Sequence, residues 1–182
     1  GGSVATDVAR TALRKGAREV HLVCIEQECD MPALSWEVEE ARREGVRFLA
    51  GLAPTRITSS WMRAEAVELA RVSAIRCDDC GRLTPELEAG NGMTVKADTV
   101  IFAVGQAVER RLLERMGLEL DGAGRPRVLD AMGATSRRGV FAAGDVVGGK
   151  GSAVEAMASG RRVARAVDAY LQGKAPQGEE RS

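Results

Sequence analysis

One stretch constrains the fold more than any other. A short apolar run, residues 140–143, ends in Gly144-Asp145 and leads through a glycine-rich loop into a helical pattern over residues 152–171. The run indicates a buried strand. Glycines let a ligand approach the backbone, and the start of a helix offers N–H groups without partners. The stretch therefore predicts a site for an anionic ligand with hydroxyl groups, which the Asp145 carboxylate suits.

A second ligand-binding pattern opens the chain. Gly1, Gly2, Ser3 and Ala5 precede a helix that is expected to end near residue 16. They match the last part of a G-x-G-x-x-G/A turn, whose backbone N–H groups hold a pyrophosphate. Neither the first glycine of such a turn nor its strand precedes them, so we expect the sequence to be a fragment of a longer protein. A cloning remnant is the alternative explanation for the two glycines.

Glu26 follows the next predicted strand, residues 19–25. It lies about 20 residues after the glycine turn, where a dinucleotide-binding fold places the acid that binds ribose hydroxyls. A carboxylate at this position would repel a 2′-phosphate. A solvated loop acid is the simpler alternative.

The rest of the chain has an α/β pattern. A helix is expected over residues 34–44 and a strand over residues 46–50. Further along, a near-continuous apolar run predicts a strand over residues 98–104, and a short charged helix is expected over residues 109–116. The tail from about residue 172 is polar and is expected to be mobile.

The middle of the chain changes period. Three segments alternate or favour β-branched side chains, at residues 55–58, 66–75 and 93–96. Turn-like residues separate or interrupt them, at Ser59-Ser60, Cys80-Gly81 and Gly90-Asn91-Gly92. This pattern predicts a β-meander inserted into the α/β fold.

Composition excludes several function classes. The 26 basic residues balance 26 acidic ones, so the chain has no net charge that would attract nucleic acid. Only 3% of residues are aromatic, too few for a surface on which bases stack. There is no apolar run of membrane-spanning length and no signal-like start, so we expect no membrane partner. Four cysteines without a signal suit a reducing compartment, and we expect a cytoplasmic protein.

The cysteines suggest a different chemistry. Cys77 and Cys80 have C-x-x-C spacing, and Cys24 and Cys29 form a second pair. Four thiolates could bind zinc or a cluster, and one C-x-x-C could be a redox dithiol. Against this, the aspartates between Cys77 and Cys80 would raise the pKa of both thiols, and a redox dithiol usually lies at a helix N-terminus. Cys24 is expected to be a buried thiol.

Several segments together resemble one family, in their order and spacing. They are residues 2–13, 31–33, 98–106, 139–146 and 155–162. The sequence resembles the small subunit of glutamate synthase and related FAD-dependent NAD(P)H oxidoreductases of the pyridine nucleotide-disulfide oxidoreductase superfamily. The resemblance extends to Leu171.

The resemblance implies an α/β, Rossmann-like FAD/NAD(P)-binding fold with an inserted β-meander, truncated at the N-terminus. Residues 1–106 are then an NAD(P)-binding domain that lacks its first strand. Residues 107–182 are the returning C-terminal part of the FAD-binding domain.

The resemblance also implies the reaction. A hydride passes from NADH or NADPH to FAD, and electrons then pass to an iron–sulfur domain or partner subunit. Hydride transfer needs no side-chain acid or base, so no catalytic residue is predicted. Where the glutamate synthase relatives are expected to carry arginines, this chain has Glu26, which favours NADH. A dithiol reductase similar to thioredoxin reductase, using Cys77 and Cys80, and a non-catalytic nucleotide-binding scaffold are the alternatives; a homo-oligomer is left open.

Specific residues acquire roles from this resemblance. Asp145, beside Gly144, would bind the ribityl chain of FAD. The backbone N–H groups at the start of the last helix would face the pyrimidine edge of the flavin and stabilise its reduced form. They belong to Ser152, Ala153 and Val154. Gly105 and Gln106 either line the junction of nicotinamide and flavin or simply end a strand.

Overall fold

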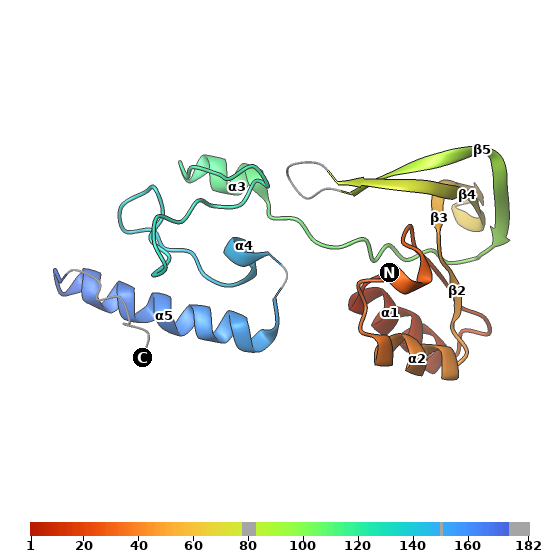
Figure 1. Ribbon diagram of the computed structural model, residues 1–182, viewed down its shortest axis with the longest axis horizontal. Helices are drawn as coiled ribbons and strands as arrows, with labels where there is room; N and C mark the ends of the chain where they lie inside the picture. Colours follow the sequence, from red (N-terminus) through yellow and green to blue (C-terminus); the bar gives the residue numbers. More distant parts are fainter. Residues whose placement is uncertain (78–82, 150, 175–182) are drawn as a thin grey trace. The chain divides into compact units, whose positions relative to one another are not determined.

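A computed structural model describes residues 1–77, 83–149 and 151–174 of the 182-residue chain (Figure 1). The chain divides into two compact units, Gly1–Gln106 and Ala107–Ser182. In the described residues, the first unit holds the strands β1–β5 with two α-helices, and the second holds the helices α3–α5. Which cofactor each unit binds stays a prediction.

The first unit opens with two helices packed on a short parallel sheet. Helix α1 (Ser3–Arg14) leads to β1 (His21–Val23), and α2 (Ser35–Arg43) leads to β2 (Arg47–Leu49). A single turn of 3-10 helix, η1 (Glu28–Asp30), lies between β1 and α2. The two strands pair in parallel, with Leu22 opposite Phe48. These elements share a core of small and aliphatic side chains, made of Ala9, Leu22, Cys24, Ala41 and Val46.

The predicted β-meander follows as a three-stranded antiparallel sheet. Strands β3 (Leu52–Ser60), β4 (Arg63–Cys77) and β5 (Leu83–Lys96) lie in the order β3-β4-β5. Leu52, Val67 and Leu69 form its core, and Val23 and Leu49 of the parallel pair pack against them. Successive side chains of a strand point to opposite faces. The parallel pair therefore has helices on one face and the meander on the other.

Two predicted turns of the meander are wrong. Ser60 ends β3 and pairs with Arg63, so the first hairpin turns at Trp61 and Met62 instead of at Ser59-Ser60. Residues 90–92 lie inside β5, where the pairing with β4 shifts register. Glycine and serine mark strand irregularities as well as turns, which sequence alone does not separate. The third predicted turn, Cys80-Gly81, lies outside the described residues.

The predicted strand over residues 98–104 is also wrong. This segment has no strand, and Ile101, Phe102 and Val104 are 59%, 67% and 86% exposed. An apolar run becomes a strand only when another strand supplies its hydrogen-bond ladder. Within the described parts of the chain, no strand pairs with it.

The second unit has one long helix. Helices α3 (Arg110–Arg115), α4 (Asp145–Gly148) and α5 (Ala153–Leu171) are its regular elements. Between α3 and α4 the chain is irregular. It is crossed by three isolated antiparallel β-bridges, which pair Leu120 with Pro126, Val128 with Thr135 and Ala134 with Phe141. Buried Thr135 donates its hydroxyl to the Val140 carbonyl at 2.8 Å, and the Phe141 ring meets Tyr170 of α5 edge-on at 5.7 Å between centroids. The hydrogen bond holds the irregular segment together, and the ring contact packs this segment against α5.

The prediction for this unit is right for helices and wrong for one strand. The helix predicted over residues 152–171 is α5, with Ser152 as its N-cap. The run at residues 140–143 has a single bridge, at Phe141, and is half-buried. As at residues 98–104, a strand pattern without a neighbouring strand does not form a ladder. Most of the tail that was expected to be mobile, residues 175–182, lies outside the described residues. No described helix is long and apolar enough to cross a membrane.

Candidate functional site

The N-terminus of α1 is open to an anion. Gly2 is the N-cap, with φ −86° and ψ 172°, and among the described residues no side chain caps this end or places an acid in its first turn. A Cβ at Gly2 would meet nothing within 4 Å. Ser3 and Ala5 lie in the first turn, where the Ala5 N–H already donates to the Gly2 carbonyl. The free N–H groups and the open space above Gly2 suit a phosphate.

Gly1 and Glu26 meet beside this helix start. The Gly1 nitrogen lies 3.3 Å from Glu26 Oε2, and the Glu26 side chain is only 13% exposed. A Cβ at Gly1 would lie 3.2 Å from atoms of Cys24, Glu26 and Met31, which is tighter than ordinary packing. The chain therefore brings together the glycine turn and the acid that the sequence predicts to act together.

Backbone hydrogen bonds hold Glu26 in place. Its carbonyl accepts from the Gly51 N–H at 2.8 Å, and the Leu52 N–H donates to the Cys24 carbonyl at 3.0 Å. Gly51 has φ +67°, a left-handed conformation that favours glycine, and a Cβ there would lie 2.7 Å from the end of the Gln27 side chain. The segment after β1 is thus fixed to the segment after β2.

Two acidic residues follow Glu26 closely in the sequence. Glu28 and Asp30 follow it in η1. Arg42 of α2 donates to the Glu28 carboxylate, and its guanidinium lies 5.4 Å from the Phe48 ring centroid. The Arg42 guanidinium is therefore already paired with a carboxylate and stacked on a ring.

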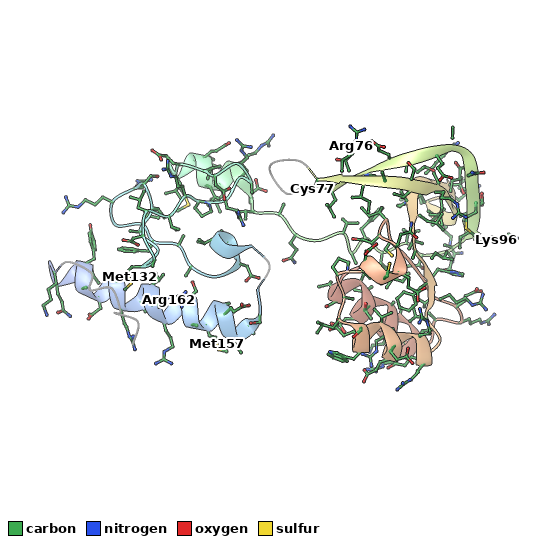
Figure 2. The ribbon with its side chains drawn as sticks, viewed as in Figure 1. Arg76, Cys77, Lys96, Met132, Met157 and Arg162 are labelled. Atoms are coloured by element: carbon green, nitrogen blue, oxygen red, sulfur yellow. The ribbon has the colours of Figure 1, made fainter. Side chains whose placement is uncertain are left out.

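The second unit contains a cavity of ≈ 440 Å³ between α4, the start of α5 and the bridged segment. Gly144, Asp145, Gly151 and Glu155 line it, together with Arg162 of α5, which Figure 2 labels. Asp145 is exposed, and within the described residues its carboxylate has no hydrogen-bond or ion-pair partner. A cavity with an unpaired carboxylate and five glycines in its lining can take a polyhydroxylated ligand close to the backbone.

Gly144 fixes the direction of Asp145. Its φ of 72° with ψ −152° is a conformation that belongs essentially to glycine. The Gly144 N–H donates to Ser159 Oγ at 3.1 Å, which ties the turn to α5. A Cβ at Gly151 would lie 3.6 Å from Asp145 Oδ1, so the loop backbone passes close to this carboxylate.

Ser152 and Glu155 cap α5. Ser152 Oγ accepts from the Glu155 N–H at 3.2 Å, while Glu155 Oε2 accepts from the Ser152 N–H at 2.6 Å. The hydrogen bond from the Ser152 backbone lowers the pKa of Glu155 below its ordinary value. The box occupies two N–H groups of the first turn. The N–H groups of Ala153 and Val154, both exposed residues, remain available in the first turn of α5, between Gly151 and Glu155 of the cavity lining.

The sequence prediction missed three residues of this cavity region. Ser159 and Arg162 lie about one and two turns beyond Glu155 of α5, and helical spacing from Glu155 would have placed them on the same face. Arg125 comes from the irregular segment, and its Nη1 would lie 3.1 Å from a Cβ at Gly149. No spacing rule connects Arg125 with this loop.

Gly105 and Gln106 end the first unit. Both are exposed, and Gly105 has φ +98°. Their assignment to a junction of nicotinamide and flavin stays a prediction.

The described cysteines occupy different environments. Cys24 is 4% exposed, as expected for a core thiol, and burial raises its pKa. Cys29 is exposed in η1, and Cys77 is the last residue of β4. Cys80 lies outside the described residues. The described residues contain no group of three or more His, Cys, Asp or Glu side chains that could hold a metal ion.

Comparison with known families shows to which family the chain belongs. The pattern of the pyridine nucleotide-disulphide oxidoreductases matches residues 1–160. The chain belongs to this family. Membership implies FAD and NAD(P)H as cofactors. The cavity at Asp145 fits one of these cofactors, because it leaves backbone N–H groups and a glycine-lined space open. The start of α1 at Gly2 fits a pyrophosphate for the same reason.

Several relatives of this chain are named as a beta subunit or a small chain. The chain is 39% identical over 171 residues to the NADP(+)-dependent formate dehydrogenase subunit beta of Moorella thermoacetica. It is 35% identical over 176 residues to the glutamate synthase [NADPH] small chain of Halomonas elongata, and 34% identical over 199 residues to the NADPH-Fe(3+) oxidoreductase subunit beta of Geobacter sulfurreducens. Each alignment covers 94–96% of this chain but only 24%, 37% and 30% of the relative, respectively.

Solved structures confirm the fold class. Thioredoxin reductase of T. acidophilum has a TM-score of 0.76 at 20% identity, with 94% of this chain and 51% of that chain covered. FprA from Mycobacterium tuberculosis has a TM-score of 0.69 at 15% identity, with 98% and 54% covered. These likenesses establish the fold alone.

Proposed function

We propose that the protein carries hydride from a pyridine nucleotide to FAD and passes the electrons to an iron–sulfur centre or partner subunit. FAD, when bound, supplies the redox chemistry. The single observation that carries the flavin half is the cavity at Asp145, where an unpaired carboxylate, a glycine loop and the start of α5 converge.

The residues of this cavity would bind and orient the cofactor. The Asp145 carboxylate accepts hydrogen bonds from hydroxyl groups, as a ribityl chain offers. The N–H groups of Ala153 and Val154, at the positive end of the α5 dipole, favour a ligand edge that becomes negative on reduction. Gly151 lets the ligand approach because it has no side chain.

The first unit would hold the pyridine nucleotide. The start of α1 at Gly2 suits the pyrophosphate, and Glu26 suits the ribose hydroxyls. We further propose that NADH is preferred over NADPH. The support is local: the acidic residues Glu28 and Asp30 follow Glu26 in the chain, and Arg42 is already paired with Glu28. The relatives' names, which specify NADP(+) or NADPH, point the other way, so this part of the proposal depends on Glu26.

The acceptor and location are also part of the proposal. The relatives named above are a beta subunit or a small chain, which supports a partner subunit as the electron acceptor. A cytoplasmic location rests on the four cysteines of the sequence.

The proposal is tested by flavin retention in the full-length protein. Asp145→Ala removes a charged hydrogen-bond acceptor, and we expect FAD affinity to fall about 10- to 150-fold. Asp168→Asn, an exposed acid farther along α5, is the matched control and should retain stoichiometric flavin. Equal flavin content in both variants, with normal thermal melts, would refute the assignment of Asp145.

A further inference from the structure

The short helix α4, which carries Asp145, has little of its own to hold it in place. Gly144 and Gly149 flank it with nearly the same backbone angles, φ 72° and ψ −152° at one end and φ 78° and ψ −151° at the other. This conformation belongs essentially to glycine, the residue with the greatest backbone freedom to lose. None of the four residues of α4 is buried. The helix therefore lies between two glycine hinges without a buried side chain as an anchor.

The hydrogen bonds of residues 144–149 mostly stay inside this segment. The carbonyls of Gly144 and Asp145 accept from N–H groups of the next turn, at 3.0 to 3.1 Å. Among the described residues, one hydrogen bond leaves the segment: the Gly144 N–H donates to Ser159 Oγ of α5 at 3.1 Å. Figure 1 shows α4 beside α5. Ser159 is therefore the polar link between the turn that carries Asp145 and the long helix.

Helical spacing places Ser159 for this contact. It is half-buried and lies on the same face of α5 as Ala156, three residues earlier. A Cβ at Gly144 would lie 3.8 Å from the Ala156 Cβ, an ordinary contact, so small side chains let α5 approach the turn. The start of α5 is already ordered by the reciprocal cap of Ser152 and Glu155. Ser159 thus connects the turn to a helix whose first residues are fixed.

We propose that Ser159 is a positioning residue of the flavin site: its hydroxyl holds the Gly144 turn and thereby sets the direction of the Asp145 carboxylate. One rigid element then presents both this carboxylate and the N–H groups of Ala153 and Val154. Binding groups that are already ordered lower the entropy cost of binding, because the ligand does not have to order them. This inference rests on the proposed function, because FAD is the ligand that the site would hold.

A purely structural role is the alternative for Ser159. A serine that only satisfies a backbone N–H contributes to the stability of its unit whatever ligand binds. The chain offers a matched example in the same unit, where Ser136 Oγ accepts from the Glu119 N–H at 2.9 Å. Ser136 is not one of the described residues that line the cavity. Comparing the two serines therefore separates positioning from stability.

The test uses the full-length protein, with flavin titration and amide hydrogen exchange as its measurements. In Ser159→Ala we expect FAD affinity to fall about 5- to 20-fold, and exchange of residues 144–149 without flavin to quicken by about the same factor, because the Gly144 N–H loses its acceptor. Ser159→Thr keeps the hydroxyl and should retain both properties. Ser136→Ala should lower the Tm as Ser159→Ala does, but leave FAD affinity and the exchange of residues 144–149 unchanged.

A double-mutant cycle shows whether Ser159 acts through Asp145. Asp145→Ala removes the group that the turn carries, so the addition of Ser159→Ala should then change FAD affinity by less than about 2-fold. The added substitution should still lower the Tm and quicken exchange, because the hydrogen bond to the Gly144 N–H is lost in either background.

Three results would each overturn the inference. If Ser159→Ala binds FAD as tightly as wild type while Asp145→Ala binds it weakly, the flavin assignment stands and Ser159 does not position Asp145. If the two effects multiply in the double variant, Ser159 acts on binding independently of Asp145. If Ser136→Ala weakens FAD binding as much as Ser159→Ala, the effect is a general loss of stability. Unchanged FAD affinity in Asp145→Ala would instead overturn the proposed function, and this inference with it.

Discussion

Ser152 and Glu155 bind each other reciprocally at the start of α5, with 2.6 Å from the Ser152 nitrogen to Glu155 Oε2 and 3.2 Å from the Glu155 nitrogen to Ser152 Oγ. The pair orders the first turn of the helix next to the cavity. It leaves the N–H groups of Ala153 and Val154 without a partner. A ligand at the cavity would therefore meet a helix end that is already ordered.

We predict that Ser152→Ala destabilises the second unit by about 1 kcal/mol, the usual value of an N-cap. FAD affinity should fall as well, because the first turn frays. Ser152→Thr keeps the hydroxyl and should preserve both properties. The measurements are urea unfolding and flavin titration of the full-length protein. An alanine variant with unchanged FAD affinity would separate the cap from the ligand site.

We predict that Glu26→Arg shifts the ratio of kcat/KM values toward NADPH. Replacing a repulsive carboxylate with a guanidinium changes the binding of a 2′-phosphate by roughly 1–3 kcal/mol, about 5- to 150-fold. Glu26→Gln should shift the ratio less, since it removes a charge without adding one. Glu65→Gln, at an exposed acid of β4 outside this acidic segment, is the control and should leave the ratio unchanged. If the wild type prefers NADPH, or if Glu26→Arg leaves the ratio unmoved, Glu26 does not select the nucleotide.

We predict that Gly133→Ala destabilises the second unit by about 2–5 kcal/mol. Gly133 has φ +78°, and a Cβ there would lie 2.4 Å from the Ala142 carbonyl oxygen and 2.6 Å from Val163 Cγ2. A left-handed alanine costs about 1–2 kcal/mol, and forced overpacking adds about 1–3 kcal/mol.

Gly117→Ala is the matched control for Gly133→Ala. Gly117 has a similar φ of +70°, but a Cβ there would meet nothing within 4 Å. The Gly117→Ala variant should show only the cost of a left-handed alanine. Equal denaturation midpoints for the two variants would mean that the segment around Ala142 moves to accommodate the methyl group.

Sequence patterns predicted the helices of this protein better than its strands. The α5 pattern carries its own start signal in Ser152 and Glu155, so the helix and its cap are both local information. A strand depends on a partner that its own residues do not specify. This is why residues 98–104 and 140–143 look like strands in the sequence and form none.

The sequence also predicted only part of the candidate site. Spacing along the chain predicted that Gly1 and Glu26 belong together, and their atoms meet. Arg125 escaped notice because it reaches the Gly149 loop from an irregular segment. The Trp61–Met62 turn escaped notice because turn prediction relies on Gly, Asn and Asp, none of which occurs there.

The last prediction concerns the contact between α1 and α2. The Glu44 carboxylate accepts from Arg10 Nη2 at 2.6 Å and from Arg14 Nε at 3.0 Å. Hydrogen bonds from Arg14 and Arg10 lower the pKa of Glu44 from 4.5 to about 2. The folded state therefore holds the proton more weakly than the unfolded state. The contribution of Glu44 to stability is fully present above pH 4.5 and is lost as the pH falls toward 2.

We expect Glu44→Gln to lower the Tm at neutral pH, and the difference from wild type to shrink steadily across this acidic window. Added salt should also reduce the difference, because the Arg14 side of the network is exposed and screened by ions. Glu39→Gln, which breaks an exposed pair with Arg43 within α2, is the control and should have a smaller effect. A Tm difference for Glu44→Gln that persists unchanged through the acidic window would show that the carboxylate's charge does not hold α1 against α2.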